Sequence, residues 1–160
     1  MSKHHRNRNW APAPQPLPED AHVIDNHTHV ASVVPFSQAM SHEAMEKGQG
    51  EVPVYSVDEL LEQAQKVGVE GVIDCGCELP NLMTAIDMAR EHPGTVHAAI
   101  AIHPNEAVLH GHRGAPGPDG LPIKYKPWHD IPFDEAMAEV HRLATTYPNQ
   151  VVAIGETGMD

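Results

Sequence analysis

The feature that most constrains the fold is a succession of four short apolar runs separated by long segments. The runs cover residues 22–27, 69–75, 96–102 and 151–154. Strands that are apolar almost throughout are typical of a parallel sheet with helices packed against its faces. The sequence therefore predicts an α/β fold in which strands and helices alternate and both faces of the sheet are covered.

The segments between the runs carry ordinary helix signals. Ser56 and Glu59 have the spacing of a capping box, and Gly68 stands where a helix would end. Two further helices are predicted over residues 80–92 and 133–147. The apolar face of the first of these two is formed by Leu82, Ala85, Ile86 and Ala89.

Three other segments are predicted to lack regular structure. Residues 1–21 begin with basic residues and then carry Pro at every second position, which predicts a disordered or loosely ordered arm. Residues 30–55 are interrupted by Gly and Pro, and residues 104–131 read as a long loop rich in Gly, Pro and His. The ordered domain is accordingly placed at residues 22–160.

Polar residues follow each predicted strand at or just beyond its C-terminal end. They are His27, His29, Cys75, Cys77, His103 and Glu156. In a (β/α)8 barrel this edge is the catalytic face, whereas a doubly wound nucleotide fold would carry a Gly-rich turn after its first strand. The first turn here is His-Thr-His, which favours the barrel. A full barrel takes about 250 residues, so the chain is predicted to contain only about the first four β/α units.

The pair His27 and His29 predicts a metal site. Alternation along a strand places both imidazoles on one face, where their ring nitrogens can share one ion. Asp25 falls on the same face and could orient a ligand. The alternative is a pair of surface histidines in a chain that contains thirteen of them.

Glu156 and His103 are the next candidates. Glu156 follows a buried strand and could bridge two divalent ions; the alternative is an ordinary ion pair, although Lys and Arg are absent from the nearby sequence. His103 could contact a substrate phosphate or stabilise developing charge, and a purely structural role is an equal alternative. Cys75 and Cys77 are interpreted as small buried residues, because two thiols without further partners make a poor zinc site.

Composition limits the classes of partner. The formal net charge of −12 argues against a protein that binds nucleic acid through broad basic attraction, but bound divalent cations would supply local positive charge in a nuclease. Two cysteines one residue apart are no disulfide framework, and a cytoplasmic, reducing location is expected. No apolar run reaches the length of a membrane span.

Four segments together resemble the TatD family of metal-dependent hydrolases, which includes deoxyribonucleases. They are residues 23–29, 68–73, 101–104 and 153–160, which read VIDNHTH, GVEGVI, AIHP and AIGETGMD. The resemblance implies a (β/α)8 barrel with one or two divalent metals, two being expected here, and does not distinguish Mg²⁺, Mn²⁺ or Zn²⁺.

The resemblance also implies roles for individual residues. His27 and His29 would be ligands of one metal, and Glu156 would be the bridging ligand. His103 matches a recurrent active-site position, and Asp160 matches the acidic end of the fourth-strand segment. Family members supply two more His ligands and an Asp from later strands, so the chain is expected to be the N-terminal portion of a longer protein or a truncated product.

The expected activity is hydrolysis of phosphodiester bonds in DNA by water that the metal activates. One alternative is an amidohydrolase-like reaction on esters or amides, which the His-x-His pair would also serve. The other is an inactive truncated fragment or binding module, in which exposed strand edges would favour association.

Overall fold

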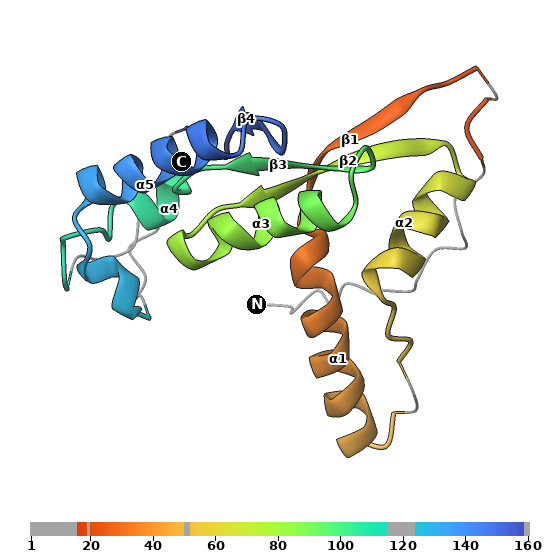
Figure 1. Cartoon of the computed structure of the whole chain (residues 1–160). Coiled ribbons are helices and arrows are strands. Elements are labelled where there is room, and N and C mark those ends of the chain that lie inside the picture. Colours follow the sequence, from red (N-terminus) through yellow and green to blue (C-terminus); the bar gives the residue numbers. More distant parts are fainter. Residues whose placement is uncertain (1–15, 19, 50–51, 115–123, 159–160) are drawn as a thin grey trace, which may run out of the picture.

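Four parallel strands form one sheet, and their order in space follows their order in the chain (Figure 1). The computed structural model describes residues 16–18, 20–49, 52–114 and 124–158. The strands are β1 (Val23–Thr28), β2 (Val69–Gly76), β3 (Val96–Ile100) and β4 (Val151–Ile154). A doubly wound sheet reverses its strand order at a switch point, whereas a barrel adds strands in sequence. The observed order β1-β2-β3-β4 is that of consecutive barrel units, and the predicted α/β alternation is confirmed.

The helix before β2 begins and ends as its sequence predicts. It is α2 (Val57–Lys66), and Ser56 and Glu59 cap each other's backbone amides reciprocally. The Ser56 amide donates to the Glu59 carboxylate over 2.8 Å, and the Glu59 amide donates to the Ser56 hydroxyl over 3.2 Å. Gly68 follows with φ +97°, a conformation that a side chain would strain.

The main core lies between the sheet and two helices, α3 (Leu79–Glu91) and α5 (Phe133–Thr146). Leu82 and Ile86 of α3 are fully buried, as are Ile100 of β3 and, nearly so, Leu143 of α5. All four apolar positions predicted for the face of α3 are buried. The helices pack against one face of the sheet, and the polar candidate residues of the sequence lie at or just beyond the C-terminal ends of its strands.

The opposite face of the sheet is not covered at β4 in the described part of the chain. Val151 packs against the core cluster, but Val152 is 52% and Ile154 is 53% exposed. The prediction that helices cover both faces is therefore wrong for this strand. Alternation puts Val152 and Ile154 on the face opposite the helices, and within the described residues that face stays about half exposed at β4.

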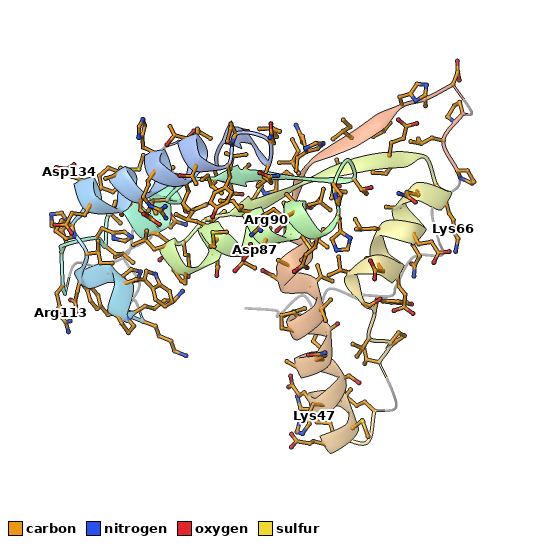
Figure 2. The ribbon with its side chains drawn as sticks, in the orientation of Figure 1. Lys47, Lys66, Asp87, Arg90, Arg113 and Asp134 are labelled. Atoms are coloured by element: carbon orange, nitrogen blue, oxygen red, sulfur yellow. The ribbon has the colours of Figure 1, made fainter. Side chains whose placement is uncertain are left out.

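The prediction that residues 30–55 lack regular structure is wrong for residues 30–46. They form the helix α1 (Val30–Glu46). Gly48, with φ +65°, lies just beyond its end and does not interrupt it. The helix buries only Val30 and Ala44, so its sequence shows no clear buried stripe. Figure 1 shows α1 extending away from the sheet, and Figure 2 shows Lys47 at its far end.

The segment between β3 and α5 is also more ordered than predicted. It contains the short helix α4 (Pro104–Ala107) and the 3₁₀ turn η1 (Pro127–Asp130). Both pack through a buried contact in which His129 Nε2 lies 2.6 Å from a carboxylate oxygen of Glu106. Such a hydrogen bond between distant polar side chains orders a loop, but it produces no regular spacing of apolar residues from which the order could be predicted.

The predicted arm over residues 1–21 lies largely outside the described residues, and its disorder stays a prediction. Of its described part, Leu17 donates its amide to the Val67 carbonyl over 2.9 Å. Among the helices that the structure describes, none has the length and apolar character needed to cross a bilayer.

Candidate metal centre

Two imidazoles lie at the end of β1, that of His27 within the strand and that of His29 just after it. Alternation is interrupted between Asp25 and Thr28, where the pairing of β1 with β2 is irregular. An Asp25 carboxylate oxygen accepts the backbone amide of His27 over 3.1 Å. Asp25 therefore contacts the backbone that carries a candidate ligand.

His29 is fixed in the tautomer that a metal ligand needs. Its Nδ1 lies 3.2 Å from the carbonyl oxygen of Cys75. A carbonyl can only accept, so Nδ1 carries the hydrogen and Nε2 keeps its lone pair. That lone pair is on the side of Glu156, 4.0 Å from Oε1.

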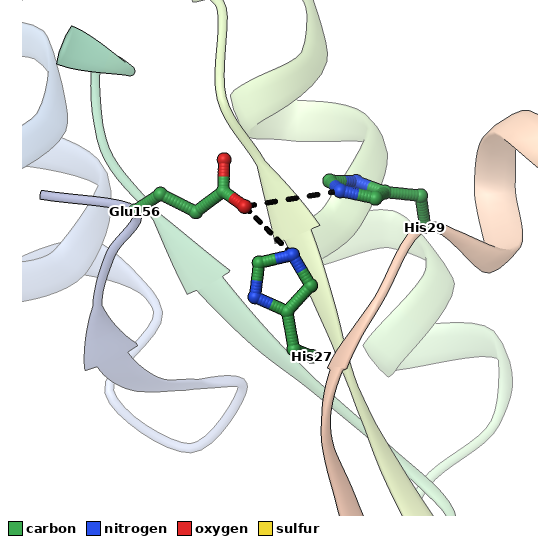
Figure 3. A group of neighbouring side chains, drawn as sticks. All are labelled: His27, His29 and Glu156. Atoms are coloured by element: carbon green, nitrogen blue, oxygen red, sulfur yellow. Dashed lines mark ion pairs between the residues drawn. The ribbon is translucent and has the colours of Figure 1, made fainter. Parts of the chain in front are cut away.

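Glu156 follows β4 and brings a carboxylate to the two histidines, as Figure 3 shows. Oε1 lies 2.7 Å from Nε2 of His27 and 4.0 Å from Nε2 of His29. The three ligand atoms all lie within 4.8 Å of one another. The structure thus brings together the three residues that the sequence proposed as ligands, from the first and last strands of the sheet.

The donor set fits a divalent cation. Ligand bonds of about 2.1 Å at tetrahedral angles would separate nitrogen and oxygen ligand atoms by roughly 3.4 Å. The two distances to Oε1 lie on either side of that value, so small side-chain movements would suffice. The His27 and His29 side chains are 53% and 45% exposed, which leaves the site open to solvent and substrate. Imidazole nitrogen and carboxylate oxygen are both common ligands of divalent metal ions, whereas Ca²⁺ takes oxygen ligands.

His103 lies at the same site but in the opposite tautomer. Its Nδ1 accepts the backbone amide of Asn105 over 3.0 Å, so in the neutral ring Nε2 carries the hydrogen. Nε2 points at Oε2 of Glu156, 3.3 Å away. The sequence placed His103 at this edge correctly, and the structure presents it as a hydrogen-bond donor.

Cys77 is the residue whose contact the sequence interpretation missed. Its thiol donates to Oε2 of Glu156 over 3.2 Å. Burial, together with the hydrogen bond to Glu156 and the charge of that carboxylate, raises the pKa of the Cys77 thiol to about 12. The thiol is therefore a donor and not a thiolate at neutral pH. The sequence did contain one indication of this contact. Side chains alternate between the two faces of a strand, so Cys75 in β2 and Cys77 just past its end are expected on the same face.

A second unpredicted residue is Asp74, which is 1% exposed. One of its oxygens accepts the amide of Ala31 over 3.4 Å, so the carboxylate serves the N-terminus of α1. Burial raises the pKa of Asp74, opposed by hydrogen bonds from the Ala31 and Val30 amides. This contact joins α1 to the end of β2, next to the candidate ligands.

A cavity of about 360 Å³ lies beside the site, between the start of α1, the end of β2 and the first turns of α3. Its lining is His29, Ala31, Ser32, Pro35, Asp74, Cys75, Cys77, Glu78, Asn81, Thr84 and Ala85. His29 therefore borders both the candidate metal site and this cavity. Asp160, the remaining predicted catalytic residue, lies outside the described residues.

A family model described as TatD-related DNase matches residues 24–160. This chain belongs to the TatD-related DNase family. TatD-related proteins are metal-dependent hydrolases built on a (β/α)8 barrel, and the four strands and their helices cover part of such a barrel. The matched range contains His27, His29, His103 and Glu156. Among curated proteins, none matches the chain.

Proposed function

We propose that this chain carries part of the active site of a divalent-metal-dependent hydrolase that cleaves phosphodiester bonds in DNA. The observation that carries the proposal is the convergence of His27, His29 and Glu156 at the C-terminal ends of β1 and β4. That edge is where (β/α)8 enzymes place their chemistry. Membership of the TatD-related DNase family supports the choice of DNA as substrate.

His27 and His29 would bind a divalent ion through Nε2, and Glu156 through Oε1. When bound, such an ion polarises a phosphoryl oxygen and lowers the pKa of water. The hydrogen bond from His29 to the Cys75 carbonyl keeps the imidazole in its binding tautomer. The Asp25 contact to the His27 amide holds the turn that carries His27.

We further propose Glu156 as the bridging ligand of two ions. Oε2 already accepts from Cys77 and lies close to His103 Nε2. A carboxylate oxygen offers about two lone-pair sites, so a second ion would take the place of one of these donors. The longer contact, that of His103, is the one we expect to give way.

His103 would then serve the substrate. Its side chain is 28% exposed, and its Nε2–H lies near the ligand cluster, where it can donate to a phosphoryl oxygen as charge develops. We propose Asp160, at the acidic end of the matched segment, as a further catalytic residue.

The test combines metal binding with DNA cleavage by the 160-residue chain in Mg²⁺ or Mn²⁺. We expect His27→Ala and Glu156→Ala to abolish cleavage and to weaken Mn²⁺ binding, because each removes one of three ligand atoms. His42→Ala is the matched control, since the His42 side chain is 77% exposed on α1 and lies beside another carboxylate, that of Glu46, four residues on. Cleavage that survives unchanged in both site variants would refute the assignment.

A substrate panel separates DNA from other targets. Phosphodiester and amide substrates are compared at equal metal concentration, and we expect turnover of the phosphodiesters alone. Hydrolysis of amides with no cleavage of DNA would favour the amidohydrolase-like alternative instead.

A further inference from the structure

The end of β2 touches every other strand end at the candidate metal centre. The carbonyl of Cys75 accepts from the His29 imidazole, which follows β1. The carbonyl of Cys77 accepts the backbone amide of His103, beyond β3, over 2.9 Å. The thiol of Cys77 donates to Glu156, beyond β4. Residues 75–77 are therefore the common support of three residues in the site.

The contact between Cys77 and Glu156 is unusual because β2 and β4 are not neighbours in the sheet. It crosses β3, and two adjacent strand spacings amount to roughly 9.6 Å. The strand register, continued one residue further, places two small residues next to Cys77. Gly76 pairs with Ile100, so Cys77 and Ala101 come next along these strands, and Gly155 follows β4. Neither Ala101 nor Gly155 has a side chain long enough to separate the thiol from the carboxylate.

The support itself is held firmly. A Cβ added to Gly76 would lie 2.8 Å from the backbone oxygen of Asn81, so the end of β2 is pressed against the start of α3. The Cys77 side chain thus projects from a fixed backbone position. A donor on a fixed backbone can orient the flexible side chain of Glu156, which is 25% exposed.

We propose that Cys77 is a positioning residue for Glu156. Its thiol holds Oε2 toward β2, which turns Oε1 toward His27 and His29 and keeps the carboxylate from rotating into solvent. This inference rests on the metal site proposed above. It assigns a role to the thiol as a donor to a ligand, and not as a ligand itself.

The competing role is direct coordination of the metal by the sulfur. The two roles differ in what a hydroxyl can replace. A serine hydroxyl donates a hydrogen bond to a carboxylate as a thiol does, but it is a poor substitute for a thiolate on a transition metal. Replacement by Ser therefore separates positioning from coordination.

The experiment is titration of the full chain with Mn²⁺, followed by calorimetry, for wild type, Cys77→Ala, Cys77→Ser and Cys75→Ala. Loss of an outer contact to a metal ligand weakens metal affinity by about 10- to 100-fold, and we expect a loss in this range for Cys77→Ala. Cys77→Ser should bind nearly as wild type. Cys75→Ala should do so too, because it keeps the carbonyl that accepts from His29.

Three results would overturn the positioning role: wild-type affinity in Cys77→Ala, equal weakening in Cys77→Ser and Cys77→Ala, or a thiolate-to-metal charge-transfer band when Co²⁺ binds to the wild type. Circular dichroism reports whether each variant is folded, and Cys77→Ser still tests the role if Cys77→Ala does not fold. His27→Ala separates the two proposals. If it binds Mn²⁺ as wild type does, the metal site itself is refuted; if it loses binding while Cys77→Ala does not, only the role of Cys77 is.

Discussion

At the scale of single residues, the two histidines differ in the hydrogen bond that Nδ1 makes. Nδ1 of His29 donates to a carbonyl, which leaves a lone pair on Nε2. Nδ1 of His103 accepts from an amide, which leaves a hydrogen on Nε2. The same side chain is thereby prepared for two different tasks within one site. The tautomer follows from backbone groups, which is why the residue type alone could not reveal it.

This difference predicts separate effects of substitution. His103→Ala should leave Mn²⁺ affinity close to that of the wild type, because Nε2–H offers the ion no lone pair. Cleavage of DNA should fall about 10²- to 10³-fold, the usual effect of removing a hydrogen-bond donor aimed at developing charge. The measurement pairs calorimetry with a nuclease assay, and His103→Ala weakening Mn²⁺ binding as much as His27→Ala would contradict the assignment.

The Cys77 thiol predicts a pH dependence of stability. Its pKa is raised from 9.0 to about 12 on folding, so the folded chain keeps a proton that the unfolded chain loses. The resulting stabilisation is fully present below pH 9 and is lost as pH rises toward 12. Urea unfolding at several pH values should show wild type losing stability more steeply above pH 9 than Cys77→Ala, and parallel curves would refute the shift.

At the scale of elements, the sequence predicted best where burial imposes a period. The strands and the helices α2, α3 and α5 were predicted closely. The buried face of α3 and the capping box at Ser56 both depend on residues only three or four positions apart in the sequence. Helix α1 was missed because it buries little and Pro35 lies within it. Its start depends instead on Asp74, a residue remote in sequence.

The contrast between α3 and α1 predicts different costs of truncation. Leu82→Ala removes a fully buried side chain and should lower the free energy of unfolding by about 2–5 kcal/mol. Met45→Ala on α1, where Met45 is 68% exposed, should change it by no more than about 0.5 kcal/mol. Chemical denaturation of both variants checks this, and similar losses would mean that Met45 contributes to the core as Leu82 does.

The candidate site divides in the same way between local and remote signals. His27, His29, His103 and Glu156 were identified as candidates because each lies at or just beyond the C-terminal end of a predicted strand. The contact of Cys77 with Glu156 was not found, because it depends on the register of β2, β3 and β4. Such a contact exists only once three strands are aligned.

At the scale of the whole molecule, the described sheet has two outer edges without a partner strand, at β1 and β4. Apolar side chains are exposed on both: Ile24 is 58% and Ile154 is 53% exposed. Open edges with apolar residues are templates for association.

Self-association of the chain is therefore expected to rise with concentration. Val152→Lys places a charge on β4, where Val152 is 52% exposed, and should shift sedimentation toward the monomer. Val54→Lys is the control, because Val54 is exposed before α2 and belongs to no strand. Equal association of the Val152→Lys variant and the wild type would show that β4 is not the contact.

The two outermost strands of the described sheet are also the ones that carry the candidate ligands. An ion bound between His27 and Glu156 would close the segment 27–156 into one loop. Such a tether removes conformations from the unfolded chain and opposes the parting of β1 from β4. The same ion would then serve catalysis and stabilise the fold, so the folded chain would be most stable with the metal bound.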